Sequence, residues 1–487
     1  MEPNLGANPE NPRPERSVPV GLLLLAMPMI ASMISRTVMS FVDFVMVSRL
    51  GAEAQAAIMP AGVLLFCVMA FGIGVVGTVS SFVAQALGKR RPEDCAAYAW
   101  QGLFLSLAIG AVVMPAWLVV DDLFVAVGHA PAVQAMEIVY VRIGLIGLGP
   151  SLAAMALANF FNGIHRPMVG FWAAAVGNLF NGLANYALIF GKWGAPEMGI
   201  AGAAWGTVAA AALQAMILLA WMLKPAIDRV YHSRANWRPR WDLLRRMLRF
   251  GMPAGLQFSV DIAAFTVFTL LLVGRFGTEQ LAAHNLVFKL LEVSFMPAVG
   301  MGMAVQAAVG KAIGAGDAPR ARRTVRWATA FAVGYMGALA LAYLAFRYPL
   351  ASALTDSPQV IDWAVKLLIF CAVFQIFDAI GITHGHALQG AGDTRWQAGA
   401  SAALVLLVLV GGGYAAVLLR PQWGAVGPWA AATAYIVLLG SVLGARWWFG
   451  PWESIQLIEP DDRDDDPPGP EPATGTSRPR EPATGGA

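Results

Sequence analysis

The sequence predicts an all-α polytopic membrane protein with twelve transmembrane helices in two parallel six-helix repeats. Apolar residues make up 57% of the 487 residues and charged residues only 13%, about half the usual charged share of roughly 25%. Of the 63 charged residues, 27 lie in 1–17, 224–249 and 452–487. The remaining charges are too few to cover a soluble globular surface. The chain also contains apolar runs long enough to span a bilayer, which predict the helices. Segments that recur at a constant spacing predict the two repeats.

Each predicted span is an apolar stretch of at least the about 20 residues that cross the hydrocarbon core. The first begins at Val18; it is too long for a signal-peptide core, contains Arg36 and precedes no A-x-A-like site. We do not expect transmembrane strands, because the stretches are far longer than the about 9–11 residues of a barrel strand and do not alternate. The stretches lie near 18–47, 54–87, 96–120, 131–160, 167–190, 199–223, 250–273, 279–312, 324–347, 358–389, 396–418 and 424–447.

The distribution of Lys and Arg predicts the orientation of the spans. Five alternate connections carry 18 of these residues, whereas those on the opposite side carry single residues such as Arg49 or Lys192. By the positive-inside rule the rich connections face the cytoplasm. With an even number of spans, both termini are expected there too. The rich connections lie near 89–91, 166, 224–249, 311–326 and 395.

The two halves of the chain repeat each other. SRLGAEAQAA at 48–57 resembles GRFGTEQLAA at 274–283, VAQALGKRRPED at 83–94 resembles VGKAIGAGDAPR at 309–320, and NGIHRPMVG at 162–170 resembles QGAGDTRWQ at 389–397. The offsets of 226, 226 and 227 indicate a duplication rather than chance similarity of small-residue-rich spans. Six spans per copy preserve orientation, so the repeats are parallel, as in one class of secondary transporter.

These repeats divide the chain into five predicted parts. An N-lobe at 18–223 and a C-lobe at 250–447 flank a basic cytoplasmic linker at 224–249. Within the linker, WDLLRRMLRF has the pattern of an amphipathic interfacial helix, although an ordinary positive-inside anchor is the favoured interpretation. The cytoplasmic tails are 1–17 and 448–487; the second contains DDRDDDPPGP and two copies of EPATG and is expected to be disordered.

Asp43 is the first ionisable residue at membrane depth that needs an explanation. An ionised Asp at mid-helix costs about 2.5–3.5 kcal/mol. Arg36 lies seven residues earlier on the same face but about 10 Å away, so a direct bond between the two is not expected. Pro28 and Pro253 interrupt the first and seventh spans at matching places, a pointer to a transporter's binding site and hinges. We therefore favour a functional role for Asp43 over simple pairing with a polar neighbour.

The fifth span places Asn178, Asn181 and Asn185 on one helical stripe, because their spacings are three and four. Such amides can hold neighbouring helices together. They can equally supply carbonyl ligands to a small cation, or support a carboxylate if Asp43 faces them. The spacing does not choose between these interpretations.

The second repeat carries Asp261 in the seventh span and Asp378 in the tenth. Gln257 and Gln375 lie one turn before them, so each acid has a polar neighbour on its own face. Two acids from different helices can share a proton or bind a monovalent cation such as Na⁺. Lys289 and Glu292 in the eighth span are three residues apart, and we expect them to neutralise each other.

Motifs of other protein classes are missing from the sequence. It contains no GxxxxGK[ST], HExxH or GxSxG pattern, which argues against an ATPase or an intramembrane hydrolase. Its three cysteines, Cys67, Cys95 and Cys371, form no CxxC pair, so neither a disulfide framework nor a zinc site is expected. We expect no enzyme activity, no cofactor and no bound metal other than a coupling ion.

Four segments of the chain are distinctive: FVDFVMVSRLG, NGLANYALIFGKWGAPEMGIAGAAWGT, SFMPAVGMGMAVQAAVGKAIGAGD and FQIFDAIGITHGHALQGAGDTR. They resemble the multidrug and toxic compound extrusion (MATE) family, closest to its norfloxacin-extruding branch, and the resemblance covers about residues 18–447. It implies two six-helix lobes around a central cavity and Na⁺- or H⁺-driven export of amphipathic, often cationic drugs.

The resemblance also assigns site residues. Asp43 matches the acid of the first lobe, Asn181 and Asn185 match the amides associated with it, and Asp378 matches the acid of the second lobe. Asp261 lies where the norfloxacin-extruding branch usually has Glu. The aspartate keeps the negative charge, but its side chain is shorter and reaches less far. Acids in both lobes leave open which lobe couples to the ion.

Together these points predict a cation-coupled antiporter of the bacterial inner membrane that works by alternating access. Its partners are expected to be small amphipathic or cationic molecules and the lipid bilayer, with no nucleic acid, and the protein is expected to be a monomer. The nearest alternative is a flippase for lipid-linked oligosaccharides or peptidoglycan precursors. A flippase for polyanionic head groups should offer several cations inside, whereas only Arg36 and Lys289 lie there, each with an acid within two turns.

Overall fold

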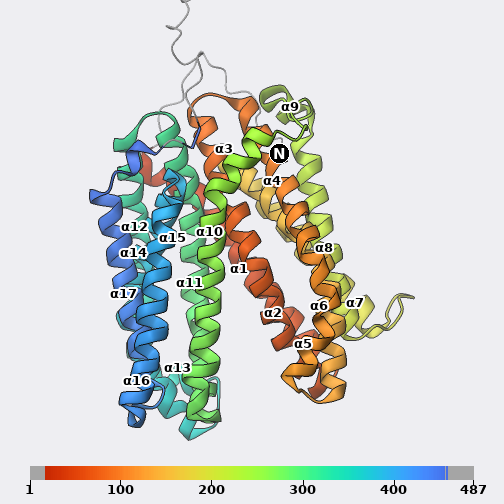
Figure 1. Ribbon diagram of the computed structural model, residues 1–487, viewed down its shortest axis with the longest axis vertical. Coiled ribbons are helices and arrows are strands. Elements are labelled where there is room, and N and C mark those ends of the chain that lie inside the picture. The colour runs from red at the N-terminus through yellow and green to blue at the C-terminus, as the bar shows by residue number, and fades with distance from the viewer. Residues whose placement is uncertain (1–16, 456, 459–487) are drawn as a thin grey trace, which may run out of the picture. The chain divides into compact units, whose positions relative to one another are not determined.

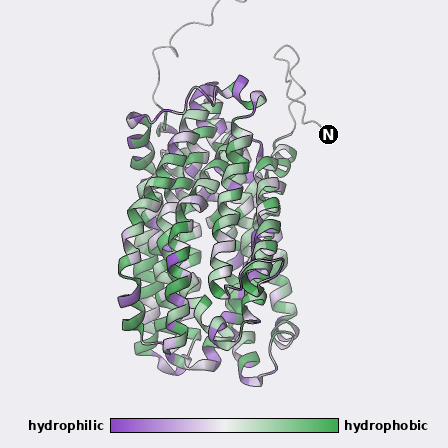
Figure 2. Cartoon of the chain, turned by 90° about the vertical axis from the view of Figure 1, so that its right-hand side faces the viewer, coloured by the Kyte–Doolittle hydropathy of each residue, from purple (hydrophilic) through white to green (hydrophobic). Residues whose placement is uncertain are grey.

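The computed structural model describes residues 17–455, 457 and 458, and the account below concerns the compact unit that ends at Leu457. Among the described residues it contains helices and no strand. Twelve helical segments are long and apolar enough to cross a membrane, which confirms the predicted number of spans. Hydrophobic residues follow the length of the helices, and hydrophilic residues gather toward their ends and connections (Figure 2).

The helices fall into an N-terminal half (α1 to α8) and a C-terminal half (α10 to α17). The first comprises α1 (Val18–Ser48), α2 (Ala52–Gly77), α3 (Val79–Gly88), α4 (Pro92–Val113), α5 (Val120–Val127), α6 (Pro131–Gly163), α7 (Pro167–Phe190) and α8 (Ile200–Met222). After α9 (Pro225–Tyr231), the second comprises α10 (Trp241–Val267), α11 (Thr278–Gly314), α12 (Ala318–Ala345), α13 (Arg347–Ser352), α14 (Pro358–Ala391), α15 (Thr394–Leu404), α16 (Gly413–Leu419) and α17 (Val426–Phe449).

Local sequence explains several helix boundaries and irregularities. Proline is the first residue of α4, α6, α7, α9 and α14, where its fixed φ suits a helix and its missing N–H is not needed. Two spans of the C-terminal half contain wider π-helical turns, at Phe268–Val273 after α10 and at Val405–Gly412 between α15 and α16. Such turns are rare in proteins, and those that do occur are often found at functional sites.

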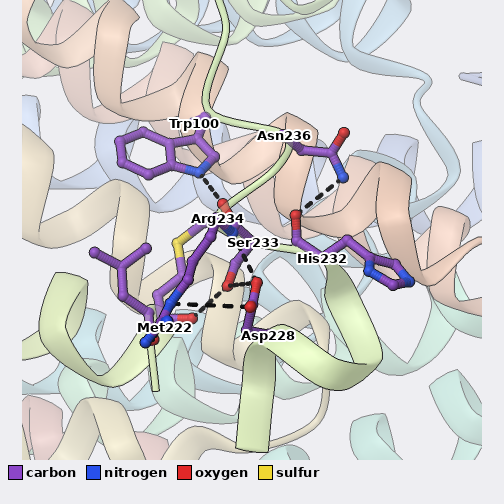
Figure 3. A network of polar contacts seen from close by, with 8 residues as sticks. Trp100, Met222, Asp228, His232, Ser233, Arg234 and Asn236 are labelled. Carbon is purple, nitrogen blue, oxygen red and sulfur yellow. Dashed lines mark hydrogen bonds and ion pairs between the residues drawn. The ribbon is translucent and has the colours of Figure 1, made fainter. Parts of the chain in front are cut away.

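The segment after α8 is folded against the N-terminal half (Figure 3). The hydroxyl of Ser233, which is fully buried, donates to the carbonyl of Met222, and the indole N–H of Trp100 donates to the carbonyl of Ser233; both distances are close to 2.8 Å. Asp228 accepts from the backbone N–H of Arg234 at 2.8 Å. α10 then begins at Trp241, so WDLLRRMLRF forms the first turns of the seventh span.

The chain beyond α17 stays folded as far as Ser454. Trp452 is fully buried and stacks on Trp447, with ring centroids 4.1 Å apart. Arg322 of α12 pairs with Glu453 at 2.8 Å. The rest of the two predicted tails, 1–16, 456 and 459–487, lies outside the described residues.

The two halves meet at the end of the bundle where α9 lies, which we call the linker end; the opposite end is the far end. Ser81 of α3 donates to the carbonyl of Gln389 at 2.8 Å, and Gln85 donates to the carbonyl of Gly390 at 2.9 Å. From the other half, Gln306 of α11 donates to the carbonyl of Gly77 at 3.0 Å. Figure 1 shows the ribbons of α1 and α2 approaching α10 and α11 toward α9 and diverging toward the far end.

A neutral histidine adds to this contact. Burial, and then the positive charge of Lys311, lower the pKa of His165 to about 4. The imidazole is therefore uncharged near pH 7, and its Nε2–H donates to the carbonyl of Ala307 at 3.3 Å. The hydrogen bonds between the halves at the linker end thus do not depend on an ionised histidine.

The duplication seen in the sequence reappears in these contacts. Gly74 of α2 lies against the backbone of Ala254 and Gly255 in α10, and Gly300 of α11, 226 residues later, lies against Ile30 of α1. A side chain at either glycine would meet backbone atoms of the opposite half. The two halves therefore pack through equivalent, glycine-dependent contacts.

Candidate functional site

In the N-terminal half, Asp43 of α1 is bonded to α7. The side-chain amide of Asn185 donates to Oδ1 of Asp43 at 2.7 Å. Asn185 is fully buried and Asp43 is half-buried. A short hydrogen bond from a buried amide to a carboxylate is among the stronger neutral–ionic contacts in proteins.

The bond continues into a chain of amides. Asn185 also donates to Oδ1 of Asn181 at 3.3 Å, and Asn181 donates to the hydroxyl of Thr207 in α8 at 3.4 Å. Asn178 is not part of this chain, because its amide donates to Ser35 of α1 at 2.8 Å. Asn181 and Asn185 therefore belong to the hydrogen-bonded group around Asp43, whereas Asn178 links α7 to α1.

One buried atom of this group has no partner. Oδ1 of Asn185 accepts no hydrogen bond in the described part of the chain, and an unmade buried hydrogen bond costs about 1–3 kcal/mol. The amide nitrogen of Asn185 faces Asp43, and its unpaired oxygen lies against Gly206 of α8. The Asp43 carboxyl group, held by this amide, is suited to take up a proton or a small monovalent cation.

Two neighbours of Asp43 were not predicted from the sequence. Tyr140 of α6 lies close enough to the carboxyl group for an electrostatic interaction, and Thr207 ends the amide chain. Tyrosine and threonine are ordinary residues of transmembrane helices, so neither gave a distinctive signal. Only the packing of α6 and α8 against α1 and α7 brings them to the carboxylate.

A glycine keeps the Asn185 amide in place. A Cβ atom at Gly206 of α8 would overlap Oδ1 of Asn185, whereas one at Gly182 of α7 would meet only Met39, at 3.8 Å. We therefore expect Gly206→Ala to displace the amide and weaken its bond to Asp43. The transport activity that the sequence predicts should fall about tenfold or more, at unchanged protein level. The matched control Gly182→Ala should keep full activity, and equal activity of both variants would contradict this role of Asn185.

In the C-terminal half, Asp261 of α10 is bonded to α15. The hydroxyl of Ser401 lies 3.1 Å from Oδ1 and 3.4 Å from Oδ2 of Asp261, and Ser401 is fully buried. Gln257, one turn earlier on α10, lies close to the same carboxyl group, as its spacing predicts. Like Asp43, Asp261 is thus held by a hydroxyl or amide donor from another helix of its own half.

Asp378 of α14 makes no hydrogen bond or ion pair to another described residue, although it is more than half enclosed. It is not bonded to Asp261, so the direct contact that a shared proton needs is missing in this conformation. Both carboxyl groups lie near Tyr435 of α17, which is buried and was not predicted from the sequence. The hydroxyl of Tyr435 can donate to either acid or help to hold a cation between them.

The remaining predicted residues lie apart from the acids. Gln375 donates to Ser294 of α11 at 2.9 Å rather than supporting Asp378, and its own Oε1 has no partner among the described residues. Lys289 and Glu292 form the predicted ion pair at 3.3 Å. Arg36 forms no ion pair or hydrogen bond with a described residue and is exposed. No group of three His, Cys, Asp or Glu side chains suited to a transition metal occurs in the described residues.

The two predicted hinge prolines lie inside continuous helices, Pro28 in α1 and Pro253 in α10. Each lies beside a close contact between the halves, next to the contacts of Ile30 and Ala254 described above. A proline removes one backbone hydrogen bond from its helix. The helices that carry Asp43 and Asp261 are therefore weakened where they touch the other half.

Comparison with known proteins gives a consistent family match. Residues 28–187 and 253–413 match the protein-family model described as MatE. Curated relatives share the name "Probable multidrug resistance protein NorM": that of Deinococcus radiodurans is 32% identical over 88% of this chain and 94% of its own length. That of Brucella suis biovar 1 is 30% identical over 87% of this chain and 92% of its own length.

Solved structures share the fold. A transporter described as the outward-facing conformation of a multidrug resistance MATE family transporter of the MOP superfamily aligns with a TM-score of 0.80 at 20% identity, over 88% of this chain and 95% of its own. A MOP superfamily transporter from Pyrococcus furiosus Vc1 also aligns with a TM-score of 0.80, at 21% identity and the same coverages. These structures confirm the twelve-helix architecture of two six-helix repeats.

Proposed function

Because this chain belongs to the MatE family, whose members are transporters and not enzymes, we propose that it is a multidrug exporter that exchanges Na⁺ or H⁺ for amphipathic, often cationic compounds. One observation carries the proposal. Each half holds a carboxylate at membrane depth, Asp43 or Asp261, bonded to a donor from another helix of the same half. A carboxylate in such a place can take up a cation and release it when the helices around it move.

The two carboxylate groups differ in a way that bears on the ion. Asp43 accepts from the amide nitrogen of the buried Asn185, while Asp261 and Asp378 share the surroundings of Tyr435. Two acids near one hydroxyl suit either one proton or one desolvated Na⁺ ion. We propose Asp43, Asn181 and Asn185 as one coupling group and Asp261 and Asp378 as the other.

We propose that the linker end faces the cytoplasm, because the Lys- and Arg-rich connections lie there. We also propose that the protein is a monomer of the bacterial inner membrane. Both termini then lie in the cytoplasm, and the lobes are 18–223 and 250–447. In this orientation the present conformation is closed to the cytoplasm by Ser81, Gln85 and Gln306.

The proposed cycle follows from that orientation. A cation from outside binds Asp43 or the Asp261 and Asp378 group, the far ends close and the linker end opens, with bending at Pro28 and Pro253. The drug then enters from the cytoplasm, and its binding is coupled to release of the cation. One charge that moves through 100 mV supplies about 2.3 kcal/mol, which matches an about 50-fold gradient of a drug without net charge. For a monovalent cationic drug, the concentration gradient of the coupling ion supplies the energy.

Transport by the purified protein in proteoliposomes tests the proposal. A fluorescent lipophilic cation such as ethidium should move against its gradient when an inward Na⁺ or H⁺ gradient is imposed, and only one ion should suffice. Empty liposomes and an ionophore that collapses the gradient are the controls. Absence of movement under both gradients, with folded protein present, would overturn the exporter assignment.

A further inference from the structure

His129 and Glu137 form a close pair at the far end of the N-terminal half that the proposed cycle does not use. His129 lies between α5 and α6, and Glu137 lies in the second turn of α6, near the far end (Figure 1). The imidazole Nδ1 lies 2.8 Å and 3.0 Å from the two carboxylate oxygens. The side chain of Glu137 is fully buried, whereas that of His129 is 37% exposed. The pair thus connects a buried carboxylate to the surface of the molecule.

The partner of Glu137 distinguishes this pair from a purely structural one. A buried carboxylate is costly unless a partner compensates it, and Glu137 is bonded only to His129 among the described residues. Histidine is the side chain that gains and loses a proton near neutral pH. The neighbouring pair of Asp121 and Arg142, at 3.0 Å, uses an arginine, which keeps its charge. Of these two pairs, only His129 and Glu137 can pass a proton between them.

The helices that pack on α6 near the far end bring no other charged side chain into contact with Glu137 in the described part of the chain. α8 contains no charged residue, and α4 has its charged residues only in its first turn, at the linker end. Glu53 of α2 and Asp122 of α5 are exposed. Glu137 therefore exchanges protons with the water at the far end through His129.

An apolar layer lies between Asp43 and the far end. It consists of the packed side chains of Val47, Ile189 and Ala203, which are at most 3% exposed. These residues lie in α1, α7 and α8, each one turn closer to the far end than the member of the Asp43 hydrogen-bonded group in the same helix. A proton that moves through the N-terminal half therefore needs a polar group that passes this layer.

Tyr140 of α6 is placed to pass the layer. Its side chain packs against the cluster that contains Val47, and it lies close enough to Asp43 for an electrostatic interaction. Glu137 precedes Tyr140 by three residues, a spacing at which side chains of one helix are neighbours. One water molecule can bridge a gap of this size. His129, Glu137 and Tyr140 thus follow one another from the surface of the far end to Asp43.

From this arrangement we infer that His129 and Glu137 are the entrance of a proton route that leads through the N-terminal half to Asp43. The inference rests on the proposed export function and adds the path of the coupling proton. His129 accepts a proton from water at the far end and passes its Nδ1 proton to Glu137. The carboxylic acid of Glu137 gives its proton to the oxygen of Tyr140, while the hydroxyl proton of Tyr140 passes to the Asp43 carboxylate. One proton has then moved from outside water to Asp43, and the three relay groups have their former charges.

Glutamine in place of Glu137 tests the route, because it keeps the size of the side chain and a group that can bond His129 but cannot carry the proton. In proteoliposomes with an imposed inward pH gradient, E137Q should transport ethidium about tenfold or more slowly than the wild type. Equilibrium binding of ethidium to the purified variant should stay unchanged, because the route affects how fast a proton arrives. E53Q, which changes an exposed glutamate at the far end of the same half, is the matched control and should keep both values.

Alanine in place of His129 gives a second test that a structural role cannot imitate. H129A should be slowed to a similar extent as E137Q. Because His129 is partly exposed, imidazole added to the buffer can take its place beside Glu137 and carry the proton. It should therefore restore most of the lost rate in H129A and leave the rate of E137Q unchanged.

Each outcome decides a different point. Wild-type rates in E137Q and H129A would overturn the route, and so would loss of ethidium binding in E137Q or an H129A variant that imidazole does not restore. If E137Q does not accumulate as folded protein, H129A with and without imidazole decides alone. Wild-type transport that responds to a Na⁺ gradient but not to a pH gradient would overturn the proton route while the export function stands. Absence of ethidium transport under any gradient would overturn the export function itself.

Discussion

Asparagine in place of Asp43 is expected to abolish active drug export. The substitution keeps the size of the side chain and an oxygen that can accept from Asn185, which lies 2.7 Å from Oδ1 in the native protein. It removes the charge, and with it the ability to exchange a proton or a cation. Without coupling, the protein should build no drug gradient, whereas one charge at 100 mV can support an about 50-fold gradient of a drug without net charge.

Two further variants compare the halves of the molecule. Asp261→Asn removes the charge bonded by Ser401, and Asp378→Asn removes the charge near Tyr435. We expect both to abolish active export as well, because each removes a carboxylate of the second proposed coupling group. The measurement is the steady-state drug gradient in energised cells or proteoliposomes, with protein level in the membrane determined in parallel.

A surface acid provides the control for these variants. Asp362 of α14 is 65% exposed and pairs with Lys366 at 2.6 Å, so Asp362→Asn should leave the gradient unchanged. Retained active export in all three site variants would contradict the coupling mechanism. Loss in only one half would instead identify that half as the one that couples.

The prediction of the spans succeeded because length and apolarity are local properties of the sequence. The predicted boundaries differ most from the observed ones where a helix continues into a polar segment. α10 begins at Trp241 rather than after the basic residues, because Leu243 and Met247 are buried on one face of its first turns. The parallel repeat was also predictable, since the offset of 226 residues between Gly74 and Gly300 is preserved in their contacts.

The partners of the acids could be predicted only in part. Spacing placed Asn178, Asn181 and Asn185 on one stripe, but the rotation of α7 against α1 decides that Asn185 meets Asp43 and Asn178 meets Ser35. That rotation depends on packing, as at Gly206 beside Asn185.

The same limit applies to the C-terminal half. Gln375 precedes Asp378 by three residues, yet it turns toward Ser294 of α11. Positions three apart differ by about 60° around a helix, enough to face another neighbour. Ser401 and Tyr435 come from spans far along the chain, and single polar residues there are common between packed helices.

A larger residue at Gly74 is expected to open the linker end and close the far end. In the present conformation a Cβ atom at Gly74 would overlap the backbone of Ala254 and Gly255, which no change of rotamer can relieve. Overpacking typically costs about 1–3 kcal/mol, and 1.4 kcal/mol changes a two-state population about tenfold. Gly74→Val should therefore shift the protein away from the conformation described here, because this contact exists only while the linker end is closed.

The distance between the far ends reports that shift. Glu53 and Glu279 are exposed residues in the first turns of α2 and α11, and they occupy equivalent positions of the two repeats. Spin labels at these sites, in protein without Cys67, Cys95 and Cys371, should give a shorter distance distribution in Gly74→Val than in the native background.

Gly62, in the same helix, provides a control that distinguishes a change of conformation from a general effect of adding a side chain to α2. A side chain at Gly62 of α2 would meet nothing within 4 Å, so Gly62→Val should leave both the distance distribution and drug export unchanged. Gly300→Val, at the equivalent contact with Ile30, should reproduce the effect of Gly74→Val. The opposite outcome is that the distances stay at their native values in both variants. A side chain at these glycines would then be accommodated without moving the halves apart. That result would show that the glycine contacts do not hold the linker end closed.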